Sequence, residues 1–136
     1  MISYNEKERV FKLDTPNTTY MIGIVDEESF VGHIYYGRKL KEAEAGYLMR
    51  TGEPPFVPSK NNRERCSFYD CFPFEYPTGG VGDYREGCIG VRTVAGHAGS
   101  MLSYVTHEII PGKPELAGLP ATFGTKGDCE TLRLVC

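Results

Sequence analysis

The sequence predicts an all-β protein: an antiparallel β-sandwich with long loops rich in proline and glycine. Nine tyrosines and seven phenylalanines, together with many β-branched residues, favour strands. Sixteen glycines and nine prolines indicate many tight turns. Several short stretches alternate with the period that a strand requires. The long, irregular connections between these stretches favour a sandwich over a closed barrel.

The first forty residues are expected to form a four-stranded antiparallel meander with short connections. Between the second and third strands, Pro16 fixes its own φ and Asn17 tolerates a left-handed backbone, so a tight turn is expected there. The expected strands are residues 2–4, 10–13, 18–25 and 30–36.

The third of these strands has apolar residues on both of its faces. Tyr20, Ile22 and Ile24 share one face, while Met21 and Val25 lie on the other. We therefore expect this sheet to be covered on both sides.

The middle of the chain has a different composition. Residues 39–48 alone have a helix-favouring composition, interrupted by Gly46, so one or two helical turns are expected. Residues 50–60 contain three prolines and should form a long loop.

Strand character returns in the second half of the chain. Further strands are expected at residues 66–76, 84–94, 101–110 and 129–136, with a glycine-rich turn at 77–82 and a loop at 111–122. The last strand pattern continues to Cys136 without a closing turn. We therefore expect residues 1–136 to be one partial sandwich domain.

Charge and cysteine usage exclude several classes of function. A net charge of −3 gives no basic footprint for nucleic acid. No apolar run reaches the ~18 residues of a membrane span, and the first twelve residues do not resemble a secretory signal. The five cysteines form no CxxC pair, which is typical of reduced thiols in a cytoplasmic protein.

Motifs for metal, phosphate and thiol chemistry are weak. The isolated histidines lack the partner spacing of a metal site, so we expect neither a metal nor a cofactor. The glycine-rich turn lacks the Lys-Ser/Thr of a phosphate-binding loop. Cys66 and Cys71 flank Ser67 with no histidine nearby, so a cysteine-dependent enzyme is the least favoured hypothesis.

Two carboxylates come close enough in sequence to suggest glycosidase chemistry, which needs a pair of them. These are Glu75 and Asp83. Arg85, however, follows Asp83 by two residues on an expected strand, so the two side chains would share a face and form an ion pair. The sequence therefore favours a structural role for Asp83.

Seven aromatic residues surround these charges. Planar rings combined with carboxylates and arginines suit a sugar-binding surface, but the same composition also fits an aromatic core beneath a long loop. These residues are Phe56, Phe68, Tyr69, Phe72, Phe74, Tyr76 and Tyr84.

Four stretches resemble the N-terminal domain of family 36 glycoside hydrolases, the bacterial α-galactosidases. They are HIYYGRKL (33–40), RERCSFYD (63–70), FEYPTGGVGDYR (74–85) and YVTHEIIPGKPELAGLPAT (104–122). The resemblance implies a β-supersandwich more than twice this length, followed by a (β/α)₈ barrel and a small β-domain. It also implies retaining hydrolysis of terminal α-galactosides such as melibiose and raffinose, with both catalytic aspartates in the barrel.

The resemblance also implies site residues and partners. Glu53 stands where relatives have an acidic residue that touches bound sugar, and Arg65 matches an arginine in the same neighbourhood. Relatives often form tetramers in which a loop of this domain reaches a neighbouring subunit's active site. Tyr36 stands where relatives often have tryptophan, in an expected core position.

The leading hypothesis is therefore an accessory domain of an α-galactosidase that is inactive alone. Its expected partners are the rest of the enzyme chain, neighbouring subunits and an α-galactoside. The alternative hypothesis is a free-standing, lectin-like carbohydrate-binding module.

Overall fold

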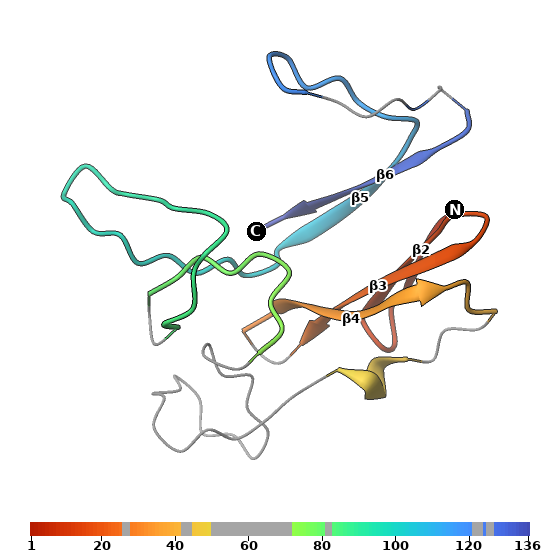
Figure 1. Ribbon diagram of the computed structural model, residues 1–136, viewed down its shortest axis with the longest axis horizontal. Coiled ribbons are helices and arrows are strands. Elements are labelled where there is room, and N and C mark those ends of the chain that lie inside the picture. Colours follow the sequence, from red (N-terminus) through yellow and green to blue (C-terminus); the bar gives the residue numbers. More distant parts are fainter. Residues whose placement is uncertain (26–27, 42–44, 50–71, 81–82, 121–123, 125–126) are drawn as a thin grey trace.

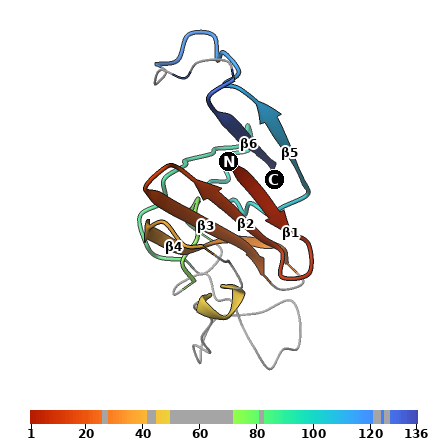
Figure 2. The same cartoon turned by 90° about the vertical axis from the view of Figure 1, so that its right-hand side faces the viewer.

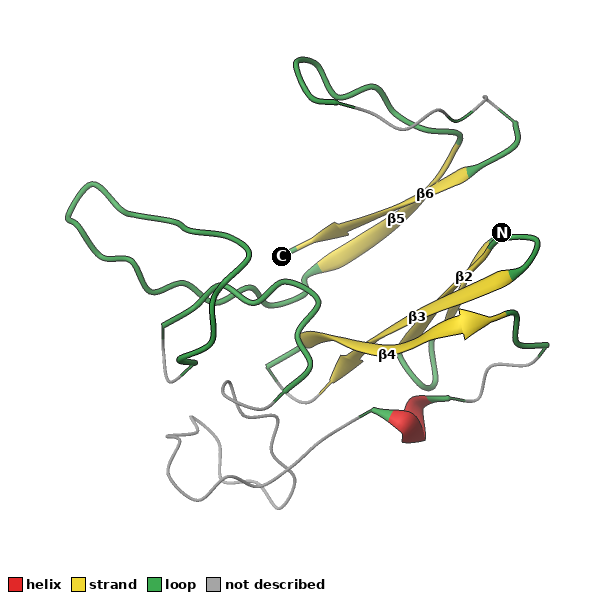
Figure 3. Cartoon of the chain, in the orientation of Figure 1, coloured by secondary structure: helices red, strands yellow, loops and turns green. Residues whose placement is uncertain are grey.

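The computed structural model describes residues 1–25, 28–41, 45–49, 72–80, 83–120, 124 and 127–136 (Figure 1). Strands and loops make up almost all of this part of the chain (Figure 3). The elements are β1 (Ile2–Asn5), β2 (Val10–Asp14), β3 (Thr18–Val25), β4 (Phe30–Arg38), the 3₁₀ helix η1 (Gly46–Leu48), β5 (Thr106–Pro111) and β6 (Glu130–Val135).

The meander expected in the first forty residues is confirmed. Strands β1 to β4 form one antiparallel sheet in the order β1-β2-β3-β4. The turn between β2 and β3 is closed by Thr15, whose side chain accepts a hydrogen bond from the backbone N–H of Thr18 at 2.9 Å.

One face of this sheet is covered by the hairpin of β5 and β6, which lies against it in both Figure 1 and Figure 2. Apolar residues of β2, β3 and β4 meet the hairpin's leucines and Tyr104 in a common core. That core consists of Phe11, Ile22, Ile24 and Val31, with Tyr4, Leu13, Tyr20, Tyr104, Leu132 and Leu134 around it. We call this side of the sheet the hairpin face. The antiparallel sandwich fold class is thereby confirmed.

The opposite face is also covered, as the alternation in β3 predicted. Val10, Met21 and Ala45 form its buried centre. Two glycines, Gly23 and Gly32, stand opposite each other here and leave a depression. The ring of Phe72, only 1% exposed, fills it together with Met49. We call this side the glycine face.

A β-bulge in β4 changes which side chains reach each face. The pairing passes from Met21↔Tyr35 to Ile22↔His33, which leaves Ile34 as an extra residue. A bulge of this kind shifts the following side chains to the other face. His33 precedes the bulge and lies opposite Ile22 on the hairpin face, whereas Tyr35, which follows the bulge, lies on the glycine face although it is two residues from His33.

The expectations for the middle of the chain are tested only in part, because residues 42–44 and 50–71 lie outside the described residues. Among the described residues of the helix expected at 39–48, one 3₁₀ turn is formed, η1, and Gly46, expected to interrupt the helix, begins this turn instead. Such a short segment cannot sustain an α-helix without strong packing. Residues 50–60 and most of the strand expected at 66–76 lie outside the described residues. The described part, 72–76, forms an isolated bridge between Phe74 and Gly32.

The prediction of a strand at residues 84–94 was wrong. Every residue from 84 to 99 is exposed, and no described strand pairs with this stretch. A strand needs a neighbour for its backbone groups, and alternation alone does not supply one. The strand expected at 101–110 is shorter and starts at Thr106, while the final strand is confirmed as β6.

Tyr36 also departs from its expected place in the core. Its side chain is 67% exposed on β4, with its ring edge against Tyr20 at 5.9 Å between centroids. The reason is that Tyr36 lies beyond the part of the hairpin face that the core residues cover.

The depression at Gly32 leads to a stability prediction. A Cβ at Gly32 would lie 2.5 Å from Phe72 Cζ and 3.0 Å from Met49 Sδ, so Gly32→Ala should lower the free energy of unfolding by about 1–3 kcal/mol. Gly90→Ala is the matched control because nothing lies within 4 Å of its added Cβ. Urea denaturation of both variants measures the difference, and equal midpoints would contradict this packing.

Candidate functional site

The candidate site is the polar region formed by residues 72–80 and 83–85 beside β3 and β4. The two residues predicted to bind substrate, Glu53 and Arg65, lie outside the described residues, as do Cys66, Ser67 and Cys71. The site is therefore built from the side chains that the structure does describe.

Glu75 is the centre of a three-residue cluster, which we call the Glu75 cluster. Its Oε1 lies 2.8 Å from Nδ1 of His33, and its Oε2 accepts a hydrogen bond from the hydroxyl of Tyr20. The Glu75 side chain is only 12% exposed. Because buried carboxylates require partners, this cluster satisfies a charge that would otherwise destabilise the fold.

The same cluster alters the acidity of Tyr20. Burial raises the pKa of its hydroxyl, and the hydrogen bond and negative charge of Glu75 raise it further. The phenol is therefore held in its protonated, donating form well above the pH at which an ordinary tyrosine ionises.

Asp83 is held in a second cluster by Arg85. Nε of Arg85 lies 2.9 Å from Oδ1 of Asp83, and a second guanidinium nitrogen lies 2.9 Å from Oδ2. Burial raises the pKa of Asp83, but the side-chain and backbone hydrogen bonds from Arg85 outweigh it and leave the pKa below its ordinary value. The guanidinium also stands 5.9 Å from the ring centre of Phe74.

The ion pair predicted between Asp83 and Arg85 is thus confirmed, but its expected cause was wrong. No strand forms here. Instead the chain bends so that the backbone N–H of Arg85 also donates to Asp83 Oδ1, at 3.0 Å. The bend brings the guanidinium of Arg85 against the carboxylate of Asp83, although the two residues are only two positions apart.

The partners of Glu75 could not be found from the sequence. His33 and Tyr20 are 42 and 55 residues away from it. They meet because residues 72–76 return from a remote part of the sequence to lie beside β4. Such a long-range contact leaves no reliable sign in a single sequence.

The described aromatic residues divide between core and surface. Phe72 is buried, and it packs with Phe30 and Phe74 at centroid distances of 5.9 and 4.8 Å. Tyr76 and Tyr84 are 51% and 92% exposed. The core reading is therefore confirmed for Phe72, while the sugar-binding reading stays a prediction for the exposed rings. Phe56, Phe68 and Tyr69 lie outside the described residues.

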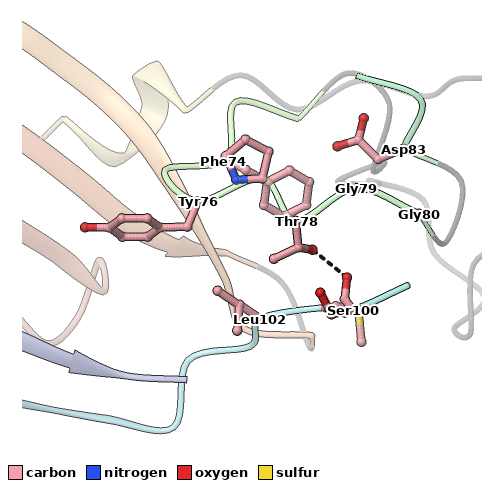
Figure 4. Close-up of a pocket in the computed structure, with 10 residues that line it drawn as sticks. Phe74, Tyr76, Thr78, Gly79, Gly80, Asp83, Ser100 and Leu102 are labelled. Carbon is pink, nitrogen blue, oxygen red and sulfur yellow. Dashed lines mark hydrogen bonds between the residues drawn. The ribbon is translucent and has the colours of Figure 1, made fainter. Parts of the chain in front are cut away.

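Several hollows adjoin the clusters, and two of them are lined by residues 74–80. The first, of about 20 Å³, lies between Phe74, Thr78, Asp83 and Ser100, and the Thr78 hydroxyl donates to the Ser100 carbonyl across it (Figure 4). It has room for about one water molecule and none for a sugar. The second is a groove of about 480 Å³ between the sheet and β6. Most of its lining residues are aliphatic, and Tyr76 and Glu75 also line it.

The remaining features concern metals and membranes. Within the described ranges, no three His, Cys, Asp or Glu side chains gather as a metal site. His107 is taken up in the core, where its ring packs against Tyr4 and Phe11, and its Nδ1 lies 2.7 Å from the Tyr104 hydroxyl. No helix among the described residues has the length and hydrophobicity to cross a membrane.

The sequence matches a family model described as the glycosyl hydrolase family 36 N-terminal domain over residues 29–136. The chain belongs to this family. The resemblance found in the four sequence stretches is thereby confirmed.

Relatives of this family 36 N-terminal domain are α-galactosidases. It is 32% identical to the bifunctional α-galactosidase/sucrose kinase AgaSK of Mediterraneibacter gnavus and 28% identical to α-galactosidase AgaA of Geobacillus stearothermophilus, over 98% of this chain in both cases. The chain spans only 14% and 18% of these two proteins.

Solved structures agree. The galactosidase domain of AgaSK superposes with a TM-score of 0.86 at 31% identity, covering 98% of this chain and 19% of that one. The family 36 α-galactosidase AgaB of Geobacillus stearothermophilus gives 0.81 at 30% identity, covering 98% and 18%.

The raised pKa of Tyr20 predicts an alkaline effect on stability. Because the folded state holds this proton more tightly than the unfolded state, its contribution is complete below pH ~10 and is lost as the pH rises above that value. Tyr20→Phe should therefore be less stable than the unchanged protein at pH 8 but should lose less stability between pH 10 and 11. Urea midpoints across this range test it, and parallel pH curves for the two proteins would refute the role of Tyr20.

Proposed function

We propose that this chain is the N-terminal accessory domain of a retaining α-galactosidase that hydrolyses terminal α-galactosides such as melibiose and raffinose. The observation that carries the proposal is the similarity of 98% of the chain to the galactosidase domain of AgaSK, with a TM-score of 0.86 at 31% identity. AgaA, a variant of which has been solved in complex with raffinose, resembles 92% of the chain with a TM-score of 0.79.

In this proposal the chain contributes to the substrate pocket without carrying out hydrolysis alone. A retaining glycosidase needs a nucleophile and an acid/base, with their carboxyl groups about 5–5.5 Å apart. Glu75 and Asp83 are the two carboxylates that the sequence suggested for these roles. Each is already hydrogen-bonded within its own cluster. We therefore place the catalytic carboxylates in the rest of the enzyme.

The proposed contribution has two parts. Glu53 and Arg65 would contact sugar at the rim of the active site, where a carboxylate and a guanidinium suit the hydroxyls of a galactoside. The domain would also take part in a cytoplasmic homo-oligomer, a tetramer, in which the rim residues reach a neighbouring subunit. The net charge of −3 suits a neutral sugar substrate.

The proposal predicts that catalysis requires the longer protein. Purified residues 1–136 should give no measurable hydrolysis of p-nitrophenyl α-galactoside, while the full-length protein should hydrolyse it. Release of nitrophenol measures both. Turnover by the isolated chain would overturn the placement of the chemistry, and an inactive full-length protein would overturn the proposed activity.

A free-standing sugar-binding module is the second candidate, favoured by the exposed ring of Tyr76, which lines the 480 Å³ groove. The aliphatic walls of that groove offer few polar partners for sugar hydroxyls. We therefore expect isothermal titration of the isolated chain with galactose, melibiose or raffinose to give no binding heat at millimolar sugar. Saturable heat that is lost in Tyr76→Ala would favour the module instead.

A further inference from the structure

The hollow of about 20 Å³ lies where two remote stretches of the chain cross. Residues between 74 and 80, together with Asp83, line one side of it, and residues 100–102 line the other (Figure 4). The hydroxyl of Thr78 donates to the carbonyl of Ser100, 22 positions away, and joins the two stretches directly. The hollow therefore lies beside a contact that holds the crossing together.

Glycines explain why side chains do not fill this hollow. Gly79 and Gly80 line it and have no side chain to place there. The two backbones also approach closely, because a Cβ added to Gly80 would lie 2.9 Å from the Cα of Gly99. Backbones this close cannot move further together, so the remaining space suits a small molecule.

Ser100 indicates that this small molecule is polar. Its Oγ is shielded from bulk solvent and has no hydrogen-bond partner among the residues that the structure describes. A buried hydroxyl without a partner is costly, and native structures rarely leave one. The hydroxyl turns about a single Cα–Cβ bond, so it can meet a partner in the hollow that Ser100 lines.

Two more polar side chains line the hollow and have acceptor capacity left. Thr78 uses its proton on the Ser100 carbonyl, which leaves the lone pairs of its own oxygen as acceptors. The Asp83 carboxylate receives three hydrogen bonds from Arg85. Since an ionised carboxylate has about four acceptor positions, one remains.

We propose that this hollow is the binding site of one ordered water molecule, which accepts a hydrogen bond from the Ser100 hydroxyl and donates to the oxygens of Thr78 and Asp83. The volume admits about one water, and about three polar partners are typical of a buried one. A metal cation suits the site less well, because Arg85 already pairs with the Asp83 carboxylate at 2.9 Å.

The water adds a second link at a point where the chain needs one. Every residue from 84 to 99 is exposed, so this stretch has little packing of its own to hold it. Its two ends leave the fold at Asp83 and Ser100, which both line the hollow. The water therefore ties together the base of the exposed stretch, and this role does not depend on the proposed enzymatic activity.

A high-resolution crystal structure of the chain tests the site directly. One water peak should lie about 2.7–3.2 Å from Ser100 Oγ and at a similar distance from Thr78 or Asp83. A hollow without such a peak overturns the proposal. A peak with several oxygen ligands at about 2.3–2.6 Å would identify a cation and overturn it as well.

Ser100→Ala gives opposite signs for the two states of the hollow. With water bound, the variant removes one of its hydrogen bonds, and the ratio of folded to unfolded protein should fall about threefold. Without water, the variant removes an unsatisfied buried hydroxyl, and the ratio should rise. Urea denaturation measures the ratio, and an unchanged or raised value overturns the proposal.

Ser3→Ala is the matched control. Ser3 is exposed on β1, so the same atom is removed where bulk water replaces it, and the ratio should stay within about twofold of the unchanged protein. The crystal structure of Ser100→Ala completes the test, because the water should be displaced or lost there. A water that keeps its position and full occupancy in this variant would show that Ser100 does not hold it.

Discussion

The outer strand of the sheet, β4, poses the constraint on which much of this structure depends. An unpaired strand edge exposes a row of backbone donors and acceptors that water or another chain must satisfy. Here the chain covers part of that edge with its own residues 72–76, which return from a remote part of the sequence. The buried ring of Phe72 and the carboxylate of Glu75 lie on opposite sides of the strand as a result.

The stretch FEYPTGGVGDYR, which carried part of the family resemblance, acquires a physical explanation from this arrangement. Its first residues, Phe74 and Glu75, bridge to β4 and complete the Glu75 cluster. Its last residues, Asp83 and Arg85, form a bidentate pair that fixes the bend at residues 83–85. The charges that first suggested catalysis therefore serve the architecture.

The parts of the fold that the sequence predicted are those set by neighbouring residues. Strands β1 to β4 follow one another with short turns, so alternation and turn residues such as Pro16 were sufficient. The stretch 84–94 has similar alternation but no pairing strand among the described residues, so the same signal failed. The Glu75 cluster was invisible because it joins residues more than forty positions apart. Glu53 and Arg65 came from family resemblance alone and stay predictions.

The crossing of the loops around Gly80 and Gly87 has a consequence for how this chain tolerates sequence change. Both glycines are exposed, yet a Cβ at Gly80 would lie 2.9 Å from Gly99 Cα, and one at Gly87 would lie 2.8 Å from the carbonyl carbon of Thr78. Backbone, unlike the end of a long side chain, cannot move aside cheaply. Solvent exposure is therefore a poor guide to mutational freedom here, and these surface positions should be as restrictive in a saturation library as the buried core.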